Sequence, residues 1–372
     1  MKILITTFNY PNRRRSAYPF VQQLVEQLAA QGHECCVVVP YSITKNKGFC
    51  PFKEERNNLT VLRPNFISLS AFSIMGFRLS TFLRRRAMKR AIKRLPFKPD
   101  VVYSHFWGSG LDIYPYAKKH CLPLFVASGE SQISKRFVSS RFRPYYDYVK
   151  GVVCVSTKNM EESVTNGMTT REKCVVLPNG INPELFHPME RQVCRQKLNI
   201  PNGAFVVAFC GTLKHQKGVK VLSDALDSIR EGEPICSLFI GRPSGEQPSC
   251  RNILHQGSVP HNEVATYLCA ADIFVLPTLH EGCCNAIVEA MACGLPVVSS
   301  DLPFNYDILS DDNSILIDPT DSHQVADAIV RLRDDNELCQ RLSQGALATA
   351  QRLTIAERAA NIIQFIKERC AK

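Results

Sequence analysis

Residues 278–298 read Thr-Leu-His-Glu-Gly-Cys-Cys-Asn-Ala-Ile-Val-Glu-Ala-Met-Ala-Cys-Gly-Leu-Pro-Val-Val and are the most informative stretch of the chain. They follow the apolar run 273–277, Ile-Phe-Val-Leu-Pro, which predicts a buried strand that ends at a proline. Residues 280–282 then predict a loop, and residues 285–293 predict a compact, alanine-rich helix that ends at a glycine. The stretch therefore predicts a strand, a loop and a helix in direct succession.

Glu289 is the unusual residue of this helix, because its neighbours Ala-Ile-Val and Ala-Met-Ala are apolar on nearly every side. An unpaired buried carboxylate costs several kcal/mol. A site that keeps such a group is expected to supply hydroxyl donors for it, and a bound sugar or ribose would do so. The alternative is a structural carboxylate that pairs with a core arginine or a backbone turn. The residues alone leave both interpretations open.

Length and composition indicate a globular protein with two domains. The chain has 372 residues, 45% hydrophobic and 21% charged, which suits two domains of about 150–190 residues. No apolar run reaches the ~18 residues that span a bilayer, and no signal peptide is expected before the first predicted strand. The 16 cysteines are scattered through apolar segments without a Cys-x-x-Cys motif, which favours buried free thiols in a reducing cytoplasm.

The net charge of +11 is unevenly distributed along the chain. Residues 1–188 contribute +16, and residues 189–372 contribute −5. The first half is therefore suited to an anionic partner, such as a nucleic acid, an anionic lipid or a phosphorylated substrate. No nucleic-acid-binding module is recognisable and few aromatic residues lie between the basic ones, which argues against nucleic acid.

A basic helix is predicted over residues 77–95, directly after the apolar and uncharged residues 66–75. This combination fits docking on an anionic membrane surface. It fits equally well a solvated basic face over an ordinary core stripe. The candidate contact residues are Arg84, Arg85, Arg86, Lys89, Arg90, Lys93 and Arg94.

The chain opens with a predicted strand at 2–7, a helix at 20–30 and a strand at 35–39, a pattern typical of a parallel sheet covered by helices. The first loop lacks the Gly-x-Gly-x-x-Gly of dinucleotide-binding folds, which argues against an NAD enzyme.

Further strands are predicted at 101–104, 124–127 and 151–155, and polar residues follow each of them. Ligands of open parallel sheets bind at the carboxyl ends of strands, so these loops are candidate walls of one cleft. Each polar residue also has a structural interpretation, as a hydrogen-bonded core histidine or a helix cap. The candidates on the first two of these loops are His105, Ser128 and Glu130.

A second sheet is predicted to begin with the strand 205–210, after an interdomain connection at 188–201. The loop 211–218, Gly-Thr-Leu-Lys-His-Gln-Lys-Gly, leads from this strand into a helix at 219–230. Glycines at both ends of the loop and two lysines within it predict a phosphate or diphosphate site. The simpler alternative is a loop whose lysines are merely solvated.

Taken together, these motifs resemble the retaining family 4 glycosyltransferases, the group 1 glycosyl transferases of the GT-B fold. The resemblance is strongest at residues 271–277 and at 281–298, where Glu281 and Glu289 are separated by seven residues. Supporting matches are Pro178-Asn179-Gly180, Gly211 with Lys217-Gly218, Gly257 with Glu263, and Gly32-His33.

The resemblance implies an α/β protein with two Rossmann-like parallel-sheet domains that face each other across a cleft. It places an acceptor-side domain at residues 1–187 and a nucleotide-sugar-binding domain at 188–354. The C-terminal helices would pack back toward the first domain, which the helix at about 355–372 would join.

The resemblance also implies roles for individual residues. Glu289 would accept hydrogen bonds from the ribose, and Glu281 would hold the hydroxyls of the transferred sugar near the anomeric carbon. Lys217 would neutralise the departing diphosphate, so neither a metal nor another cofactor is expected beyond the nucleoside diphosphate sugar, with a UDP-sugar favoured over a GDP-sugar. The other donor-binding candidates are Gly211, Thr212, Lys214, Gly282, Cys284, Asn285 and Ala286.

Three places depart from the family pattern, and the first is Ala17-Tyr18-Pro19, which replaces a Gly-Gly pair that is common in the first loop. Thr212 stands where the family has an arginine, and Lys214 is the candidate that would supply this charge instead. Ser128 stands where a histidine is common, and His105 is then the nearest substitute on the acceptor side.

The implied activity is transfer of a hexosyl or N-acetylhexosaminyl group to an acceptor hydroxyl with retention of anomeric configuration. The expected acceptor is a lipid-linked glycan of cell-envelope or exopolysaccharide biosynthesis, and the expected location is the cytoplasm, including the inner face of the membrane. The alternatives are a sugar-nucleotide epimerase or hydrolase of the same fold, and a non-catalytic membrane-associated scaffold.

Overall fold

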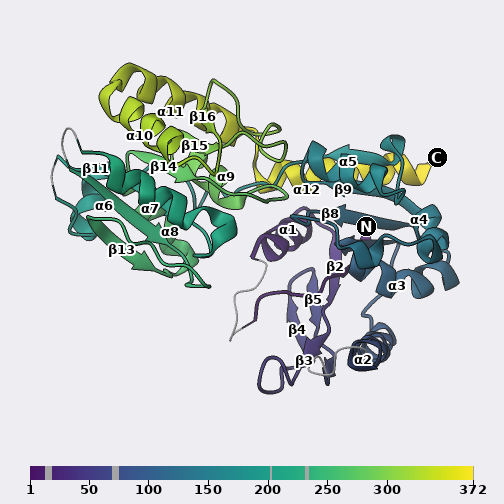
Figure 1. Cartoon of the computed structure of the whole chain (residues 1–372). Coiled ribbons are helices and arrows are strands. Elements are labelled where there is room, and N and C mark those ends of the chain that lie inside the picture. Colours follow the sequence, from purple (N-terminus) through teal and green to yellow (C-terminus); the bar gives the residue numbers. More distant parts are fainter. Residues whose placement is uncertain (13–18, 69–74, 202, 231–233, 372) are drawn as a thin grey trace. The chain divides into compact units, whose positions relative to one another are not determined.

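The computed structural model describes residues 1–12, 19–68, 75–201, 203–230 and 234–371 (Figure 1). The chain divides into two compact units, Met1–Leu177 with Arg358–Lys372, and Pro178–Glu357. The first boundary falls before the predicted residue 187 because the segment that follows Leu177 packs within the second unit. There the ring of Phe186 lies 5.4 Å from that of His261, and the Cys269 thiol donates to the His187 carbonyl.

The first unit is built on an eight-stranded sheet with the order β10-β9-β8-β7-β1-β2-β5-β4. Neighbouring strands are parallel except for the antiparallel pair β4 and β5. The strands are β1 (Lys2–Thr6), β2 (Glu34–Val38), β4 (Lys53–Arg56), β5 (Leu59–Leu62), β7 (Val101–His105), β8 (Leu124–Ser128), β9 (Val149–Cys154) and β10 (Cys174–Val176). The short strands β3 (Tyr41–Ser42) and β6 (Asn65–Phe66) pair separately.

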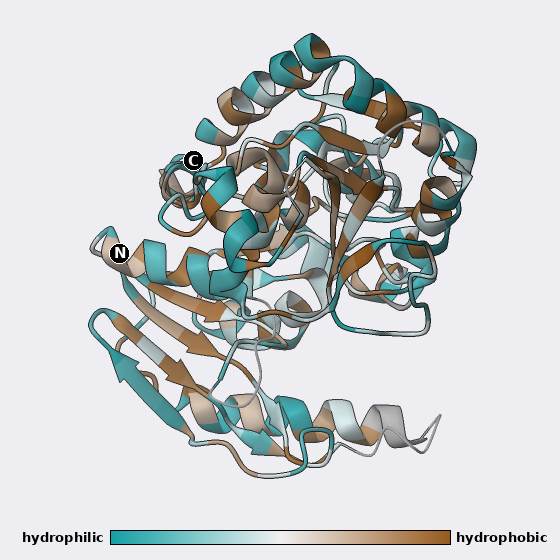
Figure 2. Ribbon diagram, turned by 90° about the vertical axis from the view of Figure 1, so that its left-hand side faces the viewer, coloured by the Kyte–Doolittle hydropathy of each residue, from teal (hydrophilic) through white to brown (hydrophobic). Residues whose placement is uncertain are grey.

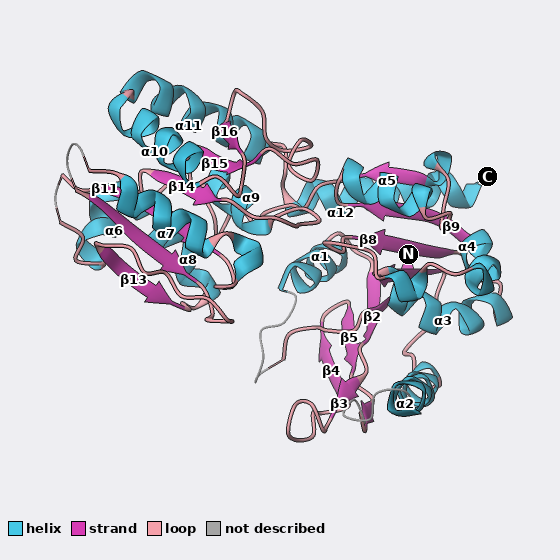
Figure 3. Cartoon of the chain, viewed as in Figure 1, coloured by secondary structure: helices cyan, strands magenta, loops and turns pink. Residues whose placement is uncertain are grey.

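Helices cover this sheet, and Figure 3 shows how they alternate with the strands. They are α1 (Pro19–Ala30), α2 (Met75–Ile92), α3 (Trp107–Lys119), α4 (Arg143–Tyr148), α5 (Thr157–Thr165) and α12 (Ile355–Ala371). Helix α1 buries Val21, Leu24, Val25 and Leu28, the spacing of a single helical face, and Gly32 follows its end with a φ of 83°.

The second unit is built on a six-stranded parallel sheet with the order β13-β12-β11-β14-β15-β16. Its apolar strands are buried between helices, and Figure 2 shows hydrophobic residues concentrated in them. The strands are β11 (Phe205–Cys210), β12 (Ile235–Ile240), β13 (Ile253–Gly257), β14 (Ile273–Leu276), β15 (Val297–Ser300) and β16 (Ser314–Ile317). The helices are α6 (Arg191–Lys197), α7 (Val219–Ser228), α8 (Val264–Ala270), α9 (Asn285–Ala292), α10 (Ser322–Asp334) and α11 (Asn336–Gln351).

Only one of the C-terminal helices packs in the first unit. Helix α12 buries Ile362 and Ile366, and its Phe365 ring lies 6.0 Å from the ring of Phe125 on β8. Helices α10 and α11 stay in the second unit, where the Ser343 hydroxyl of α11 donates to the Gly294 carbonyl at 2.5 Å. The expectation that the C-terminal helices return to the first domain therefore holds for α12 alone.

The strand orders mark where each sheet is expected to bind a ligand. In the second unit the chain proceeds from β11 through β12 to β13 and then returns to place β14 on the other side of β11. Such a switch point opens a crevice at the carboxyl ends of the two central strands. The loops after β11 and β14 lie at this point, and those after β1 and β7 occupy the corresponding point of the first unit.

Candidate active site

Hydrogen bonds join the two loops at the switch point of the second unit. The Leu279 amide donates to the Gln216 carbonyl at 2.9 Å, and the Thr278 hydroxyl donates to the same carbonyl at 3.0 Å. The Ser300 hydroxyl on β15 donates in turn to the Thr278 carbonyl at 2.6 Å. The structure thus brings the predicted loops 211–218 and 278–284 together.

Lys217 and Glu281 form an ion pair between these loops. Their side chains are only 16% and 14% exposed, and the Thr278 hydroxyl also lies 3.3 Å from Oε1 of Glu281. Burial by itself would lower the pKa of Lys217, but the neighbouring Cys284 and Glu281 outweigh it and raise this pKa above its ordinary value. Lys217 is therefore a fixed positive charge at the carboxyl edge of the sheet.

Two glycines permit the close approach of backbone segments around Lys217. Gly218 has a φ of +71°, and a Cβ at this position would collide with the Pro277 carbonyl. A Cβ at Gly241, at the end of β12, would collide in the same way with the Gly211 carbonyl. Glycine is needed at both positions because the loop after β11 is held against its neighbours by backbone contact.

Helix α9 begins at Asn285, directly after the second loop, and Asn179 fixes its first turn. The Asn179 amide nitrogen donates to the Cys283 carbonyl at 3.1 Å and to Oδ1 of Asn285 at 2.7 Å. The first amides of a helix have no acceptor within it, so they are available to an anionic group. In the sequence, Asn179 belongs to the motif Pro178-Asn179-Gly180 of the resembled family, and no role could be assigned to it there because its partners are more than a hundred residues away.

Glu289 lies one helical turn further along α9 and is partly buried. In the described part of the chain, no hydrogen bond or ion pair engages its carboxylate. Burial raises the pKa of this carboxyl to about 7. The structural alternative for Glu289 was a pairing with a core arginine. No described arginine pairs with Glu289, and no described residue donates a hydrogen bond to its carboxylate.

The remaining donor-side candidates lie on the same two loops. Thr212 is partly buried after β11, and the Lys214 ammonium donates to the Gln216 side chain at 2.8 Å. Gly282 and Cys284 are buried, and Asn285 and Ala286 are partly exposed at the start of α9. Within the described ranges, no group of three or more His, Cys, Asp or Glu side chains could hold a metal ion.

The acceptor-side candidates are engaged within the first unit. Glu130 accepts hydrogen bonds from the Trp107 amide at 3.0 Å and the Gly129 amide at 3.1 Å, and Ser128 lies 3.3 Å from it. Burial raises the pKa of Glu130 despite these donors. The carboxylate caps the start of α3, directly after Phe106, whose φ is 72°. Glu130 therefore has a structural task that the sequence did not reveal.

His105 ends β7 and is 4% exposed. Burial, with a smaller contribution from Arg358, lowers its pKa to about 3, so the imidazole is neutral. Its Nε2 has no hydrogen-bond partner in the described part of the chain.

The basic helix divides into paired and exposed residues. Arg84 and Arg85 donate to the two carboxylate oxygens of Asp112 at 2.7 and 2.8 Å, and this side chain is only 2% exposed. Arg90 donates to the Asn65 carbonyl at 3.1 Å, and Arg94 lies over the Phe52 ring. The charge of Arg84 and Arg85 is thus used within the protein, whereas Arg86, Lys89 and Lys93 are exposed.

Exposed apolar residues lie on or shortly before the same helix as these exposed cations. Ile67, Leu79 and Phe82 are 46%, 45% and 58% exposed. Residues 69–74 of the predicted apolar segment lie outside the described residues. Throughout the described ranges, every helix is too short or too polar to cross a membrane.

Comparison with solved structures defines the class of fold. Sucrose-phosphate synthase of Thermosynechococcus elongatus superposes with a TM-score of 0.80 at 19% identity, covering 100% of this chain and 99% of that chain. HepE of Anabaena, in complex with UDP and glucose, gives 0.76 at 16% identity over 99% of this chain and 100% of that chain. The fold is that of the GT-B proteins, with two Rossmann-like domains.

Sequence comparison then identifies the family. The model for "Glycosyl transferases group 1" matches residues 204–335, and that for "Glycosyltransferase Family 4" matches residues 19–185. TuaC of Bacillus subtilis, named for teichuronic acid biosynthesis, is 25% identical over 89% of both chains. A D-inositol 3-phosphate glycosyltransferase of Stackebrandtia nassauensis is 26% identical over 71% of this chain and 67% of its own. The chain belongs to the group 1, family 4 glycosyltransferases, which confirms the resemblance.

Proposed function

We propose that this glycosyltransferase moves a hexosyl or N-acetylhexosaminyl group from a UDP-sugar to a hydroxyl of a glycan acceptor, with retention of anomeric configuration. One observation carries the proposal. The Lys217–Glu281 pair and Glu289, whose carboxylate has no hydrogen-bond donor among the described residues, lie on two joined loops and the helix that follows, at the carboxyl edge of one sheet. The complex of HepE with UDP and glucose supports the choice of donor.

Each group matches one part of a nucleotide sugar. Glu289 accepts hydrogen bonds from the ribose hydroxyls, which supply donors that the described residues do not. The first amides of α9 and the ammonium of Lys217 face the diphosphate. Glu281 orients the hydroxyls of the transferred sugar and, through its ion pair, the side chain of Lys217.

The transfer itself needs positioning and charge stabilisation rather than a protein nucleophile. The bond between the anomeric carbon and the diphosphate oxygen breaks while the acceptor oxygen bonds to the same face of that carbon. The acceptor proton passes to the departing diphosphate oxygen. Lys217 and the helix amides stabilise the charge that develops there, so the proposal requires no metal or other cofactor.

The acceptor is proposed to be a lipid-linked glycan that the enzyme meets at the membrane. The first half of the chain carries the positive charge, and a basic–apolar surface is formed by Ile67, Leu79, Phe82, Arg86, Lys89 and Lys93. Basic side chains attract anionic lipids, and the apolar ones can enter the headgroup region. The name of TuaC, which refers to an envelope polymer, supports this class of acceptor.

Melting-temperature shifts with a series of nucleotide sugars test the donor site. We expect UDP-sugars to stabilise the wild-type protein, Glu289→Ala to lose this stabilisation, and Glu337→Ala, an exposed change on α11, to retain it. Stabilisation that persists in Glu289→Ala would contradict the ribose assignment. Turnover of the donor without any acceptor would instead favour an epimerase or hydrolase, and a wild-type protein that no nucleotide sugar stabilises would favour a scaffold.

A further inference from the structure

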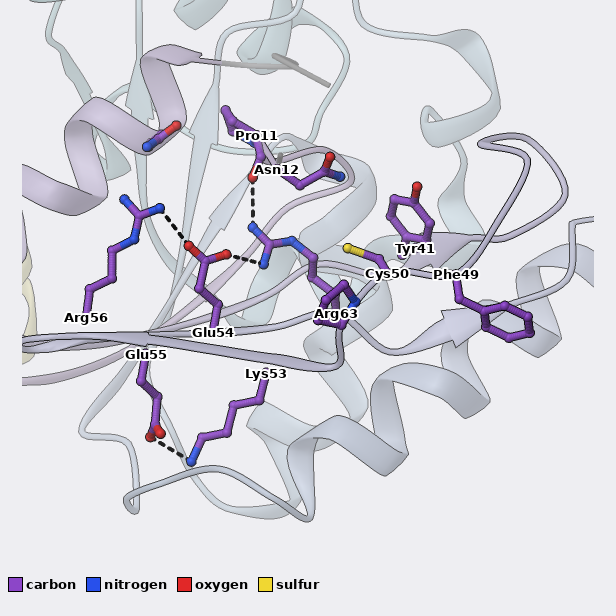
Figure 4. A pocket seen from close by; sticks show the side chains of 12 residues that line it. Pro11, Asn12, Tyr41, Phe49, Cys50, Lys53, Glu54, Glu55, Arg56 and Arg63 are labelled. Atoms are coloured by element: carbon purple, nitrogen blue, oxygen red, sulfur yellow. Dashed lines mark hydrogen bonds and ion pairs between the residues drawn. The ribbon is translucent and has the colours of Figure 1, made fainter. Parts of the chain in front are cut away.

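A cavity of about 730 Å³ lies within the first unit, and its described lining contains none of the residues discussed for donor and acceptor (Figure 4). Its walls include Asn12, Tyr41 and Arg63, which follow β1, β2 and β5 in the sheet, and the antiparallel strand β4. Asn12, Tyr41 and Arg63 lie toward the carboxyl edge of the sheet, where ligands of such folds bind, and the lining continues along β4. Its volume is in the range of about 300–1,000 Å³ that is common for small-molecule sites.

Arg63 holds the walls of this cavity in place. Its side chain is 3% exposed, and it donates to Glu54 on β4 and to the Pro11 carbonyl after β1, both at 2.7 Å. Its guanidinium also lies 5.9 Å from the centre of the Tyr10 ring. The cavity is thus a rigid feature in which three segments are fixed by one buried cation.

The described cations that line the cavity all form ion pairs. Glu54 pairs with both Arg63 and Arg56, and Arg56 also reaches Glu26 on α1 at 3.3 Å. Burial would raise the pKa of Glu54, but the hydrogen bonds from the two arginines outweigh it and lower this pKa, so the carboxylate is charged. Lys53 pairs with Glu55 at 2.6 Å.

Among the described residues, each of the three cations that line the cavity is thus paired with a carboxylate, although the first half of the chain is strongly basic. This balance disfavours a phosphate, a nucleotide or a lipid headgroup, each of which would need surplus positive charge. It favours a neutral ligand with many hydroxyls, because each hydroxyl can accept a hydrogen bond from a guanidinium and donate one to a carboxylate.

The lining has a polar end and an apolar end. In Figure 4 the ion pairs of Glu54 gather on one side, and Tyr41 and Phe49 lie on the other. Tyr41 is buried, whereas the Phe49 ring is 73% exposed. A sugar has the same two-sided character, with hydroxyls around its edge and an apolar C–H face that can pack on an aromatic ring.

We propose that this cavity binds one or two uncharged sugar units of the acceptor glycan, distinct from the unit that receives the new bond. The identification of the ligand as part of an acceptor rests on the proposed function. The pocket would then select the acceptor by its glycan chain, through contacts in the first unit alone.

Isothermal titration of free oligosaccharides, without any nucleotide sugar, tests this site. The probes are maltotetraose, cellotetraose and tetra-N-acetylchitotetraose. We expect at least one of them to bind the wild-type protein at millimolar concentration or below. The change Phe49→Ala should weaken that binding by about five-fold or more, which corresponds to ~1 kcal/mol. The control is Tyr306→Ala, which removes an exposed aromatic ring of the second unit and should leave the affinity unchanged.

Failure of all three probes to bind, or equal affinity of wild type and Phe49→Ala, would overturn the site. Displacement of the bound oligosaccharide by glucose 1-phosphate in preference to glucose would overturn its neutral character. Titration of UDP-glucose into the same samples separates this proposal from the proposed function. The protein could bind the oligosaccharide through Phe49 and yet fail to bind UDP-glucose. That result would support the pocket and count against the transferase mechanism.

Discussion

Glu289 is the clearest link between sequence, structure and function in this chain. The sequence marked it as a carboxylate in an apolar helix, and the structure leaves it without a donor among the described residues while burial raises its pKa to about 7. The sequence could identify the residue because the mismatch is local. It could not reveal that Asn179 fixes the same helix end, because the two segments lie about a hundred residues apart and meet only through the fold.

The raised pKa of Glu289 predicts that donor affinity depends on pH. The charged carboxylate accepts hydrogen bonds from ribose hydroxyls better than the neutral acid, so binding should favour the ionised form and lower this pKa. The affinity for UDP-glucose should therefore rise between about pH 6 and pH 8. The dependence should disappear in Glu289→Gln, and titration calorimetry at the two pH values measures it. If the affinity of Glu289→Gln for UDP-glucose changed with pH as that of the wild type does, a group other than Glu289 would be responsible.

The raised pKa of Glu289 also affects the stability of the ligand-free protein. A carboxyl group whose pKa is higher when folded than when unfolded destabilises the fold as pH rises above its unfolded pKa, and the loss is complete above the folded pKa. Removal of this charge should therefore stabilise the ligand-free protein near neutral pH. The melting temperature of Glu289→Gln should exceed that of wild type at about pH 8 and approach it at about pH 5.

The elements of the two sheets were largely predictable, and those of the cavity were not. Strands such as β11 and β14 are buried on both faces, so they appear in the sequence as unbroken apolar runs. Strand β4 reads Lys-Glu-Glu-Arg and lies at the sheet edge, where hydrogen bonds rather than apolar burial hold it. Such a charged run lacks the apolar stretch or alternation that indicates a strand, so the pocket that β4 helps to form could not be anticipated from the sequence.

The loop after β11 depends on the backbone approach at Gly218. In Gly218→Ala, the new Cβ would collide with the Pro277 carbonyl, in addition to the strain of a φ of +71°. The expected result is a lower melting temperature and a loss of transfer activity, because the loop that carries Lys217 must shift.

The control for this change is Gly203→Ala. Its φ is +80°, but nothing lies within 4 Å of the added Cβ, so it carries the strain without the collision. We expect Gly203→Ala to cost about 1 kcal/mol of stability and to retain activity. Equal losses of activity in the two variants would show that close packing against Pro277 is not required.

The uneven charge of the whole molecule predicts a salt-sensitive association with membranes. Vesicles that contain anionic phospholipid should sediment the wild-type protein at low salt and release it at high salt, because added ions screen the basic–apolar surface. Lys89→Glu and Phe82→Ala should each weaken the association, whereas Tyr306→Ala, an exposed aromatic change in the second unit, should not. Equal binding to purely zwitterionic vesicles would contradict an electrostatic contribution.

Turnover by the Lys217 variants tests the catalytic role of the Lys217–Glu281 pair most directly. Release of UDP from UDP-glucose, dependent on a glycan acceptor, should fall by about 10²-fold or more in Lys217→Ala, because the charge that stabilises the departing diphosphate is lost. Lys220→Ala, which removes an exposed lysine near the start of α7, should retain turnover, and circular dichroism should show both variants folded. Near-wild-type turnover by folded Lys217→Ala would contradict this mechanism.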